Sequence, residues 1–439
     1  MGPLAMALLL FAIMLALMAV RVPIAVSMFL AGVTGYLLQA GWPPLAAHLK
    51  TYAYARFSSY DLSVIPLFLL MGQFATQGGL SRALFRFAAA ALGNFRGGLA
   101  MASVVACAAF GSVCGSSIAT AATIGSVALP EMKRHGYSGR LATATVAAGG
   151  TLGILIPSSV ILVVYAILTE QNIAKLFAAA FVPGIIAMIG YVVAIGIYVR
   201  LVPGHPPEHD RVSREDLWES AKGVWPIVVI FFVVFGGIYG GVFTPTEGAA
   251  VGAAITFFTA MGRGEMTGAK LARSFYSTAE ASAMIFMIFL GADLLNSALA
   301  LTQAPNRLAE AVAGLGWPPL AVVATILLFY VLLGCVMDEL SMILLTIPIF
   351  FPLVMALDLG MSATETAIWF GILVLMVVEI GLIAPPVGLN VYVVNGIDRD
   401  TPIGESYRGV LPFLVSDFLR TLLLLFFPIL SLYLVQFMR

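Results

Sequence analysis

The chain has 439 residues, of which 61% are hydrophobic and only 10% are charged. A soluble domain carries about 25% charged residues and about 45–50% apolar ones. The composition therefore predicts an integral membrane protein. The 22 Lys and Arg residues balance the 22 Asp and Glu residues, so the chain lacks the basic excess of a nucleic-acid-binding protein.

Membrane-spanning helices need about 20 apolar residues. No cleavable signal peptide is expected, because the first apolar run has no basic start and Arg21 leads directly into the second. The polar stretch 200–222 is predicted to be a linker with a short amphipathic helix from Ser213. Uninterrupted candidate spans occupy 4–20, 23–40, 62–77, 174–200, 222–241, 245–262, 279–302 and 409–437.

Two further apolar regions, 97–169 and 317–396, are interrupted and contain an internal duplication. Gly153-Ile-Leu-Ile-Pro157 matches Gly381-Leu-Ile-Ala-Pro385 without a gap. Upstream, a Gly-Ser-Val segment at Gly111 matches a Gly-Cys-Val segment at Gly334. The two halves of the chain thus repeat the same pattern in the same order.

Each repeat is predicted to consist of an amphipathic arm (79–94 and 305–315), a helical hairpin and a broken helix. Non-helical backbone inside a membrane is tolerated only where it is buried in protein or lines a cavity. Paired breaks in two halves are the best sequence indicator of a transporter binding site. We expect an all-α polytopic membrane protein with about 11 transmembrane helices and two re-entrant hairpins.

The basic residues predict an inverted repeat, because Lys and Arg collect on the cytoplasmic side. Only Arg307 flanks the second hairpin, so the first hairpin should open to the cytoplasm, the second to the outside, and both termini should lie outside. The expected divisions are scaffold 1–61, first repeat 62–200, linker 201–222, scaffold 223–278, second repeat 279–408 and C-terminal helix 409–439. The first hairpin is flanked by Arg82, Arg86, Arg96, Lys133, Arg134 and Arg140.

Several chemistries have no candidate residues. The histidines at 48, 135, 205 and 209 are expected in loops, which argues against a histidine proton relay, and no Walker loop precedes a Lys-Ser/Thr pair. The three cysteines have no CxxC spacing and predict neither a disulfide framework nor a zinc site; they are Cys107, Cys114 and Cys335. We expect no enzymatic activity.

Sodium fits the residues better than protons, since a sodium site needs neutral oxygens and a proton site needs a titratable group. The hydroxyl donors are Ser112, Ser116, Ser117, Thr120 and Thr123 in the first repeat, and Ser341 and Thr346 beside Asp338 in the second. Hairpin helices predicted to begin at Ile118 and near Ser341 would point positive helix ends at an anionic substrate.

A few ionisable residues lie in or near apolar stretches. Asp338, Asp293 and Glu379 are candidates for a functional role, and Asp293 shares a helix face with Asn296. The other expectations are that Glu247 caps a helix and that Asp417 and Arg420 neutralise each other.

Five blocks resemble the large membrane subunit of tripartite ATP-independent periplasmic (TRAP) transporters: GSVCGSSIATAATIGSVALPEMKRHGY, GGTLGILIPSS, GGIYGGVFTPTEGAAVGA, GCVMDELSMILL with IPIFFPL after it, and GLIAPPVGLN. The resemblance covers at least 66–396. It implies the elevator-type fold of the ion-transporter superfamily and sodium-driven import of a small organic acid across the bacterial inner membrane. It also implies two partners, a separate small four-helix membrane subunit and a periplasmic substrate-binding protein.

By the same resemblance, about two sodium sites are expected at the tips and breaks. The chain departs from many relatives at Pro157-Ser158 and at Leu340-Ser341. The implied sodium-binding residues are Ser116, Ser117, Gly149, Leu152, Ile154, Gly381, Ala384 and Val387, and the candidate substrate-binding residues are Ser116, Ser117, Thr120, Asp338, Ser341, Pro157 and Pro385.

Two alternatives remain open from the sequence. A stand-alone sodium-coupled dicarboxylate carrier of the same superfamily would transport without partners. A channel would conduct without saturation, and an intramembrane enzyme would need a nucleophile–base pair, for which the spans offer no candidate.

Overall fold

The computed structural model describes residues 2–202, 214–304, 307–308, 310, 314, 316–335 and 337–438. Across these residues the chain is helical and contains no strand. The first half comprises α1 (Pro3–Ala19), α2 (Ile24–Ala40), α3 (Trp42–Phe57), η1 (Tyr60–Ser63), α4 (Val64–Gln77), α5 (Leu80–Leu92), α6 (Gly98–Cys114), α7 (Ser117–Arg134), α8 (Gly139–Leu155), α9 (Val160–Thr169) and α10 (Ile173–Leu201).

The second half follows residues 203–213 of the predicted linker (201–222), which lie outside the described residues. Most of the second predicted arm (305–315) also lies outside them. This second half comprises α11 (Arg214–Tyr239), α12 (Pro245–Gly262), α13 (Gly268–Leu301), α15 (Pro319–Gly334), α16 (Glu339–Met355), α17 (Ala363–Ile383), α18 (Leu389–Ile397), α19 (Ile403–Phe426), α20 (Ile429–Leu432) and η2 (Val435–Phe437).

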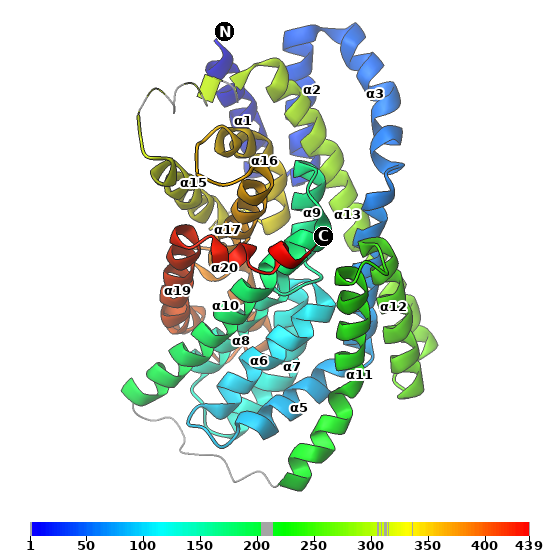
Figure 1. Ribbon diagram of the computed structural model, residues 1–439, viewed down its shortest axis with the longest axis vertical. Helices are drawn as coiled ribbons and strands as arrows, with labels where there is room; N and C mark the ends of the chain where they lie inside the picture. The colour runs from blue at the N-terminus through cyan, green and yellow to red at the C-terminus, as the bar shows by residue number, and fades with distance from the viewer. Residues whose placement is uncertain are drawn as a thin grey trace.

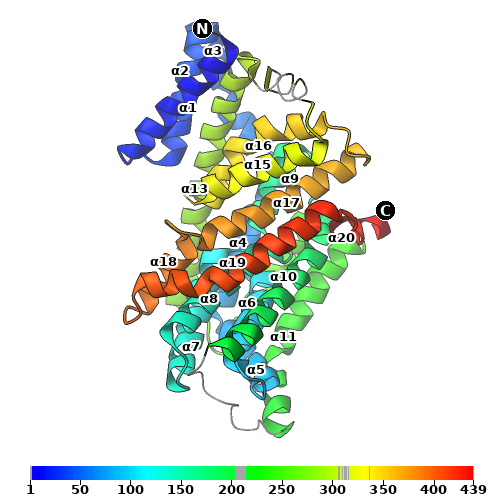
Figure 2. The same cartoon turned by 90° about the vertical axis from the view of Figure 1, so that its left-hand side faces the viewer.

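The helices form an elongated body (Figure 1). Helices α1, α2, α3 and the end of α13 lie at one end of the long axis, and α5 lies at the other. Between them, α10, α17 and α19 pack side by side across the molecule (Figure 2). The broken helices α8 and α17 therefore lie in the middle, surrounded by other helices.

Exposure follows this arrangement. An apolar 18-residue stretch of α17 is completely buried, whereas only 33% of such a stretch of α10 is buried. The outer faces of α10 and α11 expose large apolar side chains such as Ile189, Val193 and Phe232. Because contiguous exposed apolar surface is not stable in water, these faces belong against lipid. The chain is an all-α polytopic membrane protein.

Six described helices are long and apolar enough to cross a membrane, counting α8 and α9 together as one. Five apolar helices are shorter, including the four at 3–19, 24–40, 98–114 and 319–334. A further pair, Tyr60–Gln77 and Leu80–Leu92, is bent by 66°. The total of about 11 spans remains a prediction.

Three sequence predictions are wrong in detail. Helix α3 contains His48, which was expected in a loop, and the ring of His48 stacks between Tyr36 and Tyr52. The candidate span 409–437 is interrupted, because α19 ends at Phe426 before Pro428. The hairpin helices begin earlier than predicted, at Ser117 and Glu339, because Ser116 and Asp338 serve as their N-caps.

Candidate functional site

Two helical hairpins of the predicted kind are present. The first is α6–α7, with its tip at Gly115 and Ser116, and the second is α15–α16, with its tip between Gly334 and Glu339. Gly115 has φ +67, and a Cβ there would collide with the carbonyl oxygen of Ser158. Only glycine fits this turn, which brings the first tip directly onto the break between α8 and α9.

Each hairpin packs on its own broken helix through a pair of glycines. A Cβ added at Gly111 would lie 2.5 Å from Cα of Gly153, and one at Gly381 would lie 2.6 Å from Cα of Gly334. These are the glycines that the internal duplication places in correspondence. Close backbone approach through small residues is the usual packing device of membrane helices, and here it occurs at equivalent points of both repeats.

The repeats also interlock. Helix α9 of the first repeat packs on α16 of the second, and α18 of the second packs on α7 and α8 of the first. Asn390 of α18 donates a hydrogen bond to the carbonyl of Ala147, at 3.2 Å. The four hairpin and broken-helix elements therefore form one packed core.

A cavity of about 450 Å³ lies where the two tips meet. Ser116 lines it from the first tip, and Asp338, Glu339 and Ser341 line it from the second. The opposite wall comes from α2 and α13, through apolar side chains such as Ile285 and Ile288. The cavity is thus bounded by the interlocked core on one side and by helices outside it on the other.

The tips are held by their caps and by one contact between them. The Ser116 hydroxyl accepts from the amide of Ala119 at 3.4 Å, and Asp338 Oδ2 accepts from the amide of Ser341 at 3.0 Å. Across the gap, the Ser117 hydroxyl donates to Glu339 Oε2 at 3.1 Å. Ser117 and Glu339 are the first residues of α7 and α16, so equivalent positions of the two repeats touch.

Two buried hydroxyl oxygens near the tips make no hydrogen bond. They are Thr120 Oγ1 and Ser341 Oγ, and both side chains are fully buried. A Cβ at Gly153 would lie 2.5 Å from Thr120 Oγ1 and 2.7 Å from the carbonyl oxygen of Ser116. Oxygens thus crowd around the first break, and a buried hydroxyl without a protein partner is free to bind an ion or a polar group of a substrate.

The predicted sodium-binding residues fall into different settings. Leu152 and Ile154 lie in the last turn of α8, where the Leu152 carbonyl accepts a hydrogen bond from the amide of Ile156 at 3.3 Å. The carbonyls that follow it in this turn lie beyond the last repeat of the helical hydrogen-bond pattern. Gly149 lies within the continuous part of α8 and faces Cys107 of α6. Ala384 is the C-cap of α17, and the carbonyl of Val387 accepts a hydrogen bond from the Tyr407 hydroxyl at 2.6 Å.

The predicted substrate residues are only partly brought together. Ser116, Asp338 and Ser341 line the tip cavity, whereas Ser117 reaches it through Glu339. Thr120, Pro157 and Pro385 do not line it; Pro157 and Pro385 lie in the two breaks. The roles of all these residues remain predictions.

A second polar cluster lies away from the tips and is fully buried. Arg420 Nη2 lies 2.7 Å from Glu379 Oε2 and 3.0 Å from Asp417 Oδ1, and the Tyr191 hydroxyl donates to Asp417 at 2.9 Å. Asp417 and Arg420 pair as expected, but Glu379, a predicted functional residue, belongs to the same cluster. Asp293, another of the three predicted functional residues, forms an ion pair with Arg56 between α13 and α3.

Glu247 has the capping role that the sequence suggested. It forms a capping box with Thr244 at the start of α12, in which its carboxylate accepts hydrogen bonds from the amide of Thr244 at 2.8 Å and from the hydroxyl of Thr244 at 2.9 Å. This residue stabilises a helix end and has no contact with the tip cavity.

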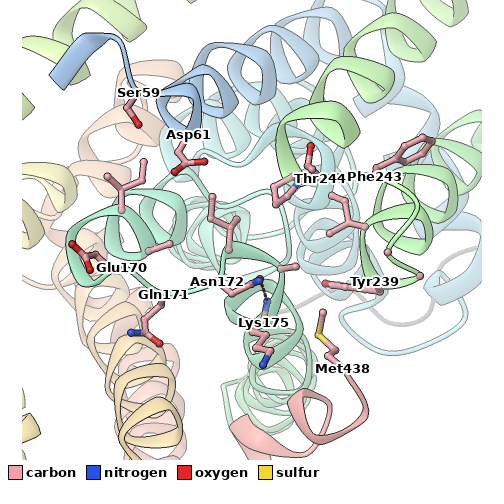
Figure 3. Close-up of a pocket in the computed structure, with 18 of the residues that line it drawn as sticks. Ser59, Asp61, Glu170, Gln171, Asn172, Lys175, Tyr239, Phe243, Thr244 and Met438 are labelled. Atoms are coloured by element: carbon pink, nitrogen blue, oxygen red, sulfur yellow. Dashed lines mark hydrogen bonds between the residues drawn. The ribbon is translucent and has the colours of Figure 1, made fainter. Parts of the chain in front are cut away.

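A larger cavity, of about 900 Å³, is separate from the tips. Figure 3 shows it between the turn after α9, the turn between α11 and α12, and η1, with Met438 at its rim. Asp61, Glu170, Lys175 and Tyr239 line it, and it shares no lining residue with the tip cavity. Its lining contains both acidic and basic side chains, and it lies at the ends of helices, as a basin on the surface of the protein does.

Sequence reasoning missed Glu339 and Asn390. Glu339 lies in the block GCVMDELSMILL and Asn390 lies in the block GLIAPPVGLN. In these two blocks, the sequence pattern indicated Asp338 and Ser341 in the first and the residues of the helix break in the second. A polar side chain within a few residues of a helix break is the signal that could have identified them, since such groups are costly in a membrane.

Comparison with known proteins agrees with this geometry. Residues 11–430 match the family described as "Tripartite ATP-independent periplasmic transporter, DctM component". The chain is 37% identical over 375 residues to the C4-dicarboxylate TRAP transporter large permease protein DctM of Pseudomonas aeruginosa, covering 85% of this chain and 86% of that one. It is 33% identical over 442 residues to the protein of the same name from Vibrio cholerae, covering 96% and 95%.

A more distant relative and one solved structure also match the chain. The sialic acid TRAP transporter permease protein SiaT of Haemophilus influenzae is 27% identical over 417 residues, covering 94% of this chain and 66% of that protein. The crystal structure of the Alcanivorax borkumensis YdaH transporter superposes with a TM-score of 0.63 at 14% identity, covering 96% and 98%. On the strength of the family match and of relatives above 30% identity over most of its length, the chain belongs to the DctM component family of tripartite ATP-independent periplasmic transporters.

Proposed function

We propose that the chain is the large membrane subunit of a transporter that imports a small organic acid across the bacterial inner membrane, driven by a sodium gradient. The tip cavity carries the proposal, because it places serine hydroxyls and two helix N-termini around a space the size of a small molecule. Relatives named for C4-dicarboxylates and for sialic acid support the organic-acid class. Helix N-termini favour anions such as a carboxylate.

Sodium is the proposed coupling ion. Thr120 Oγ1, the Ser116 carbonyl and the free carbonyls at the end of α8 supply neutral oxygens near the first break. Ser341 Oγ and the carbonyls around Ala384 supply them near the second. Hard cations prefer such oxygen donors. The oxygens named near the first break include no carboxylate, so a sodium ion there would not have to neutralise a buried anion.

The proposed movement is of the elevator type. The interlocked core meets α2 and α13 across a mainly apolar cavity wall. Such a wall can slide without breaking ion pairs, so the core could carry substrate from one side of the membrane to the other. A periplasmic binding protein would deliver the acid, and a small four-helix subunit would complete the part that stays fixed.

Uptake in proteoliposomes tests this function. We expect an inward sodium gradient to drive accumulation of an organic acid when the chain, the small subunit and the binding protein are all present, and to fail when any one is omitted. Uptake by the chain alone would instead identify a stand-alone carrier. Undiminished uptake of an ester in place of the free carboxylate would contradict anion binding at the helix ends.

A further inference from the structure

The tip cavity is unequal in charge. The first tip contributes the neutral Ser116, whereas the second contributes the carboxylates of Asp338 and Glu339. Among the described residues that line the cavity, none is Lys, Arg or His. An incoming organic acid therefore meets two helix ends that favour its carboxylate and two carboxylates that do not.

The two carboxylates are engaged differently. Asp338 is used as a helix cap, through the amide of Ser341. Glu339 accepts a hydrogen bond from the Ser117 hydroxyl and stays partly exposed to the cavity. A carboxylate offers about four acceptor positions, so Glu339 retains capacity for a donor on a bound molecule.

A second observation shows that the cavity is built for a polar guest. Ser341 lines it, is fully buried, and its hydroxyl makes no hydrogen bond. The facing wall is apolar, formed by residues such as Met284 and Ile285. Polar groups in such surroundings are costly unless a partner reaches them, and a bound substrate can supply that partner to Ser341 and Glu339 together.

We propose that Glu339 determines specificity: the site selects organic acids that carry a hydroxyl or ammonium group near the carboxylate over analogues that carry hydrogen or a second carboxylate there. The inference rests on the proposed function of the tip cavity as the substrate site. The O–H or N–H group donates to Glu339, while the substrate carboxylate lies at the helix ends. An analogue without a donor leaves Glu339 unpaired, and a second carboxylate places like charges together.

The test measures binding to the purified full-length chain in lipid nanodiscs with sodium, so that no binding protein imposes its own selectivity. The probes are two matched series at millimolar concentration: propionate, L-lactate and L-alanine, then succinate, L-malate and L-aspartate. Apparent affinities come from the rise in Tm with probe concentration. For the wild-type chain we expect the hydroxyl and amino members to bind about tenfold or more tightly than the unsubstituted acid of their series.

Glu339→Gln removes the charge at constant shape, and Glu339→Ser copies the residue at the equivalent position of the first tip. Both variants should keep the Tm of the ligand-free protein. In both, the ratio of the affinity for the hydroxyl or amino member of a series to the affinity for its unsubstituted acid should fall to near one. The matched control is Glu365→Gln, in the exposed capping box at the start of α17, which should preserve the preference. Wild-type protein with no preference, or with no stabilisation by any probe, overturns the proposal, as does a preference that survives in both Glu339 variants.

Failure of the proposed function gives a different pattern. Wild-type chain that prefers the donor-bearing acids, yet supports no uptake with its partners, would retain the Glu339 inference and refute transport. Normal uptake by wild-type protein that shows no binding preference would support transport and refute the Glu339 inference.

Discussion

The two repeats share their backbone contacts and differ in their charges. Gly111 and Gly153 in the first correspond to Gly334 and Gly381 in the second, and both pairs are in close backbone approach. At equivalent positions, however, the first repeat has hydroxyl residues and the second has acids: Ser117 against Glu339 at the tips, and Thr151 against Glu379 in the broken helices.

This difference shows which features the duplication had to keep. Backbone approach at the glycines sets the position of each tip on its break, so it cannot vary without moving the tip. Side chains at the tips and on the broken helices can vary, because they do not set this backbone contact. Glu379 is compensated by Arg420 of α19, an ion pair that has no counterpart at Thr151, which instead lies 3.2 Å from the Tyr191 hydroxyl.

The largest expected effect is loss of the arginine that compensates the second repeat. Arg420→Met leaves Glu379 and Asp417 buried without a cation, which should lower the free energy of unfolding by about 3–5 kcal/mol. Thermal unfolding of the purified protein, or its yield as a monodisperse peak, measures this. Arg408→Met, on the exposed part of the same helix, is the matched control and should leave the Tm unchanged; equal loss in both would contradict the cluster's role.

The next effect tests the contact that the repeats share. Gly381→Ala places a Cβ 2.6 Å from backbone atoms of Gly334, which cannot rotate away. We expect the free energy of unfolding to fall by about 1–3 kcal/mol, and uptake to fall with it because the second tip is displaced. Gly404→Ala has no atom within 4 Å of the added Cβ and should be harmless. A stable, fully active Gly381→Ala protein would rule out close approach at the second break.

A smaller effect concerns the link between repeats at the ends of α7 and α18. Lys133 lies 2.5 Å from Asp398. Burial opposes ionisation of Asp398, but hydrogen bonds from Lys133 and Thr401 outweigh it and hold the pKa of this carboxyl below its ordinary value. A lowered folded-state pKa stabilises the protein above the unfolded pKa of about 3.9 and loses that contribution as the pH falls further.

Asp398→Asn should therefore lower the free energy of unfolding by about 1 kcal/mol at neutral pH, a modest value because Lys133 is partly exposed. The difference in Tm between variant and wild type should disappear as the pH falls through the acid range below about 4. A difference that persists undiminished in acid would show that shape, and not charge, accounts for the contact.

The change with the smallest expected effect on stability is Ser341→Ala, which should alter transport more than folding. Ser341→Ala removes a buried hydroxyl that has no partner, so unfolding should change by less than about 0.5 kcal/mol. Sodium-dependent uptake should still weaken, measured as a higher sodium concentration for half-maximal rate. Thr346→Val is the comparison, because the Thr346 hydroxyl does have partners, including Tyr330 at 2.6 Å, and its loss should destabilise the protein more than it changes sodium dependence.

The sequence by itself determined the membrane class, the two hairpins and the two breaks, because these follow from local properties: apolar run length, glycine and proline. It also predicted Ser116, Asp338 and Ser341, which line the tip cavity. These three are polar residues beside a point where a helix cannot continue, which is again a local property. It missed helix α3, whose charged and aromatic residues interrupt any apolar run, and it set the starts of α7 and α16 too late.

Only the tertiary structure decided which of these residues meet. Ser117 and Glu339 are 222 positions apart in the sequence, and Glu379 of α17 forms an ion pair with Arg420 of α19. Local pattern predicts an element but not its neighbours, since packing between distant segments depends on the shapes of all the helices at once. For that reason the sequence predicts neither the ion cluster that surrounds Glu379 nor the position of Glu339 in the wall of the tip cavity.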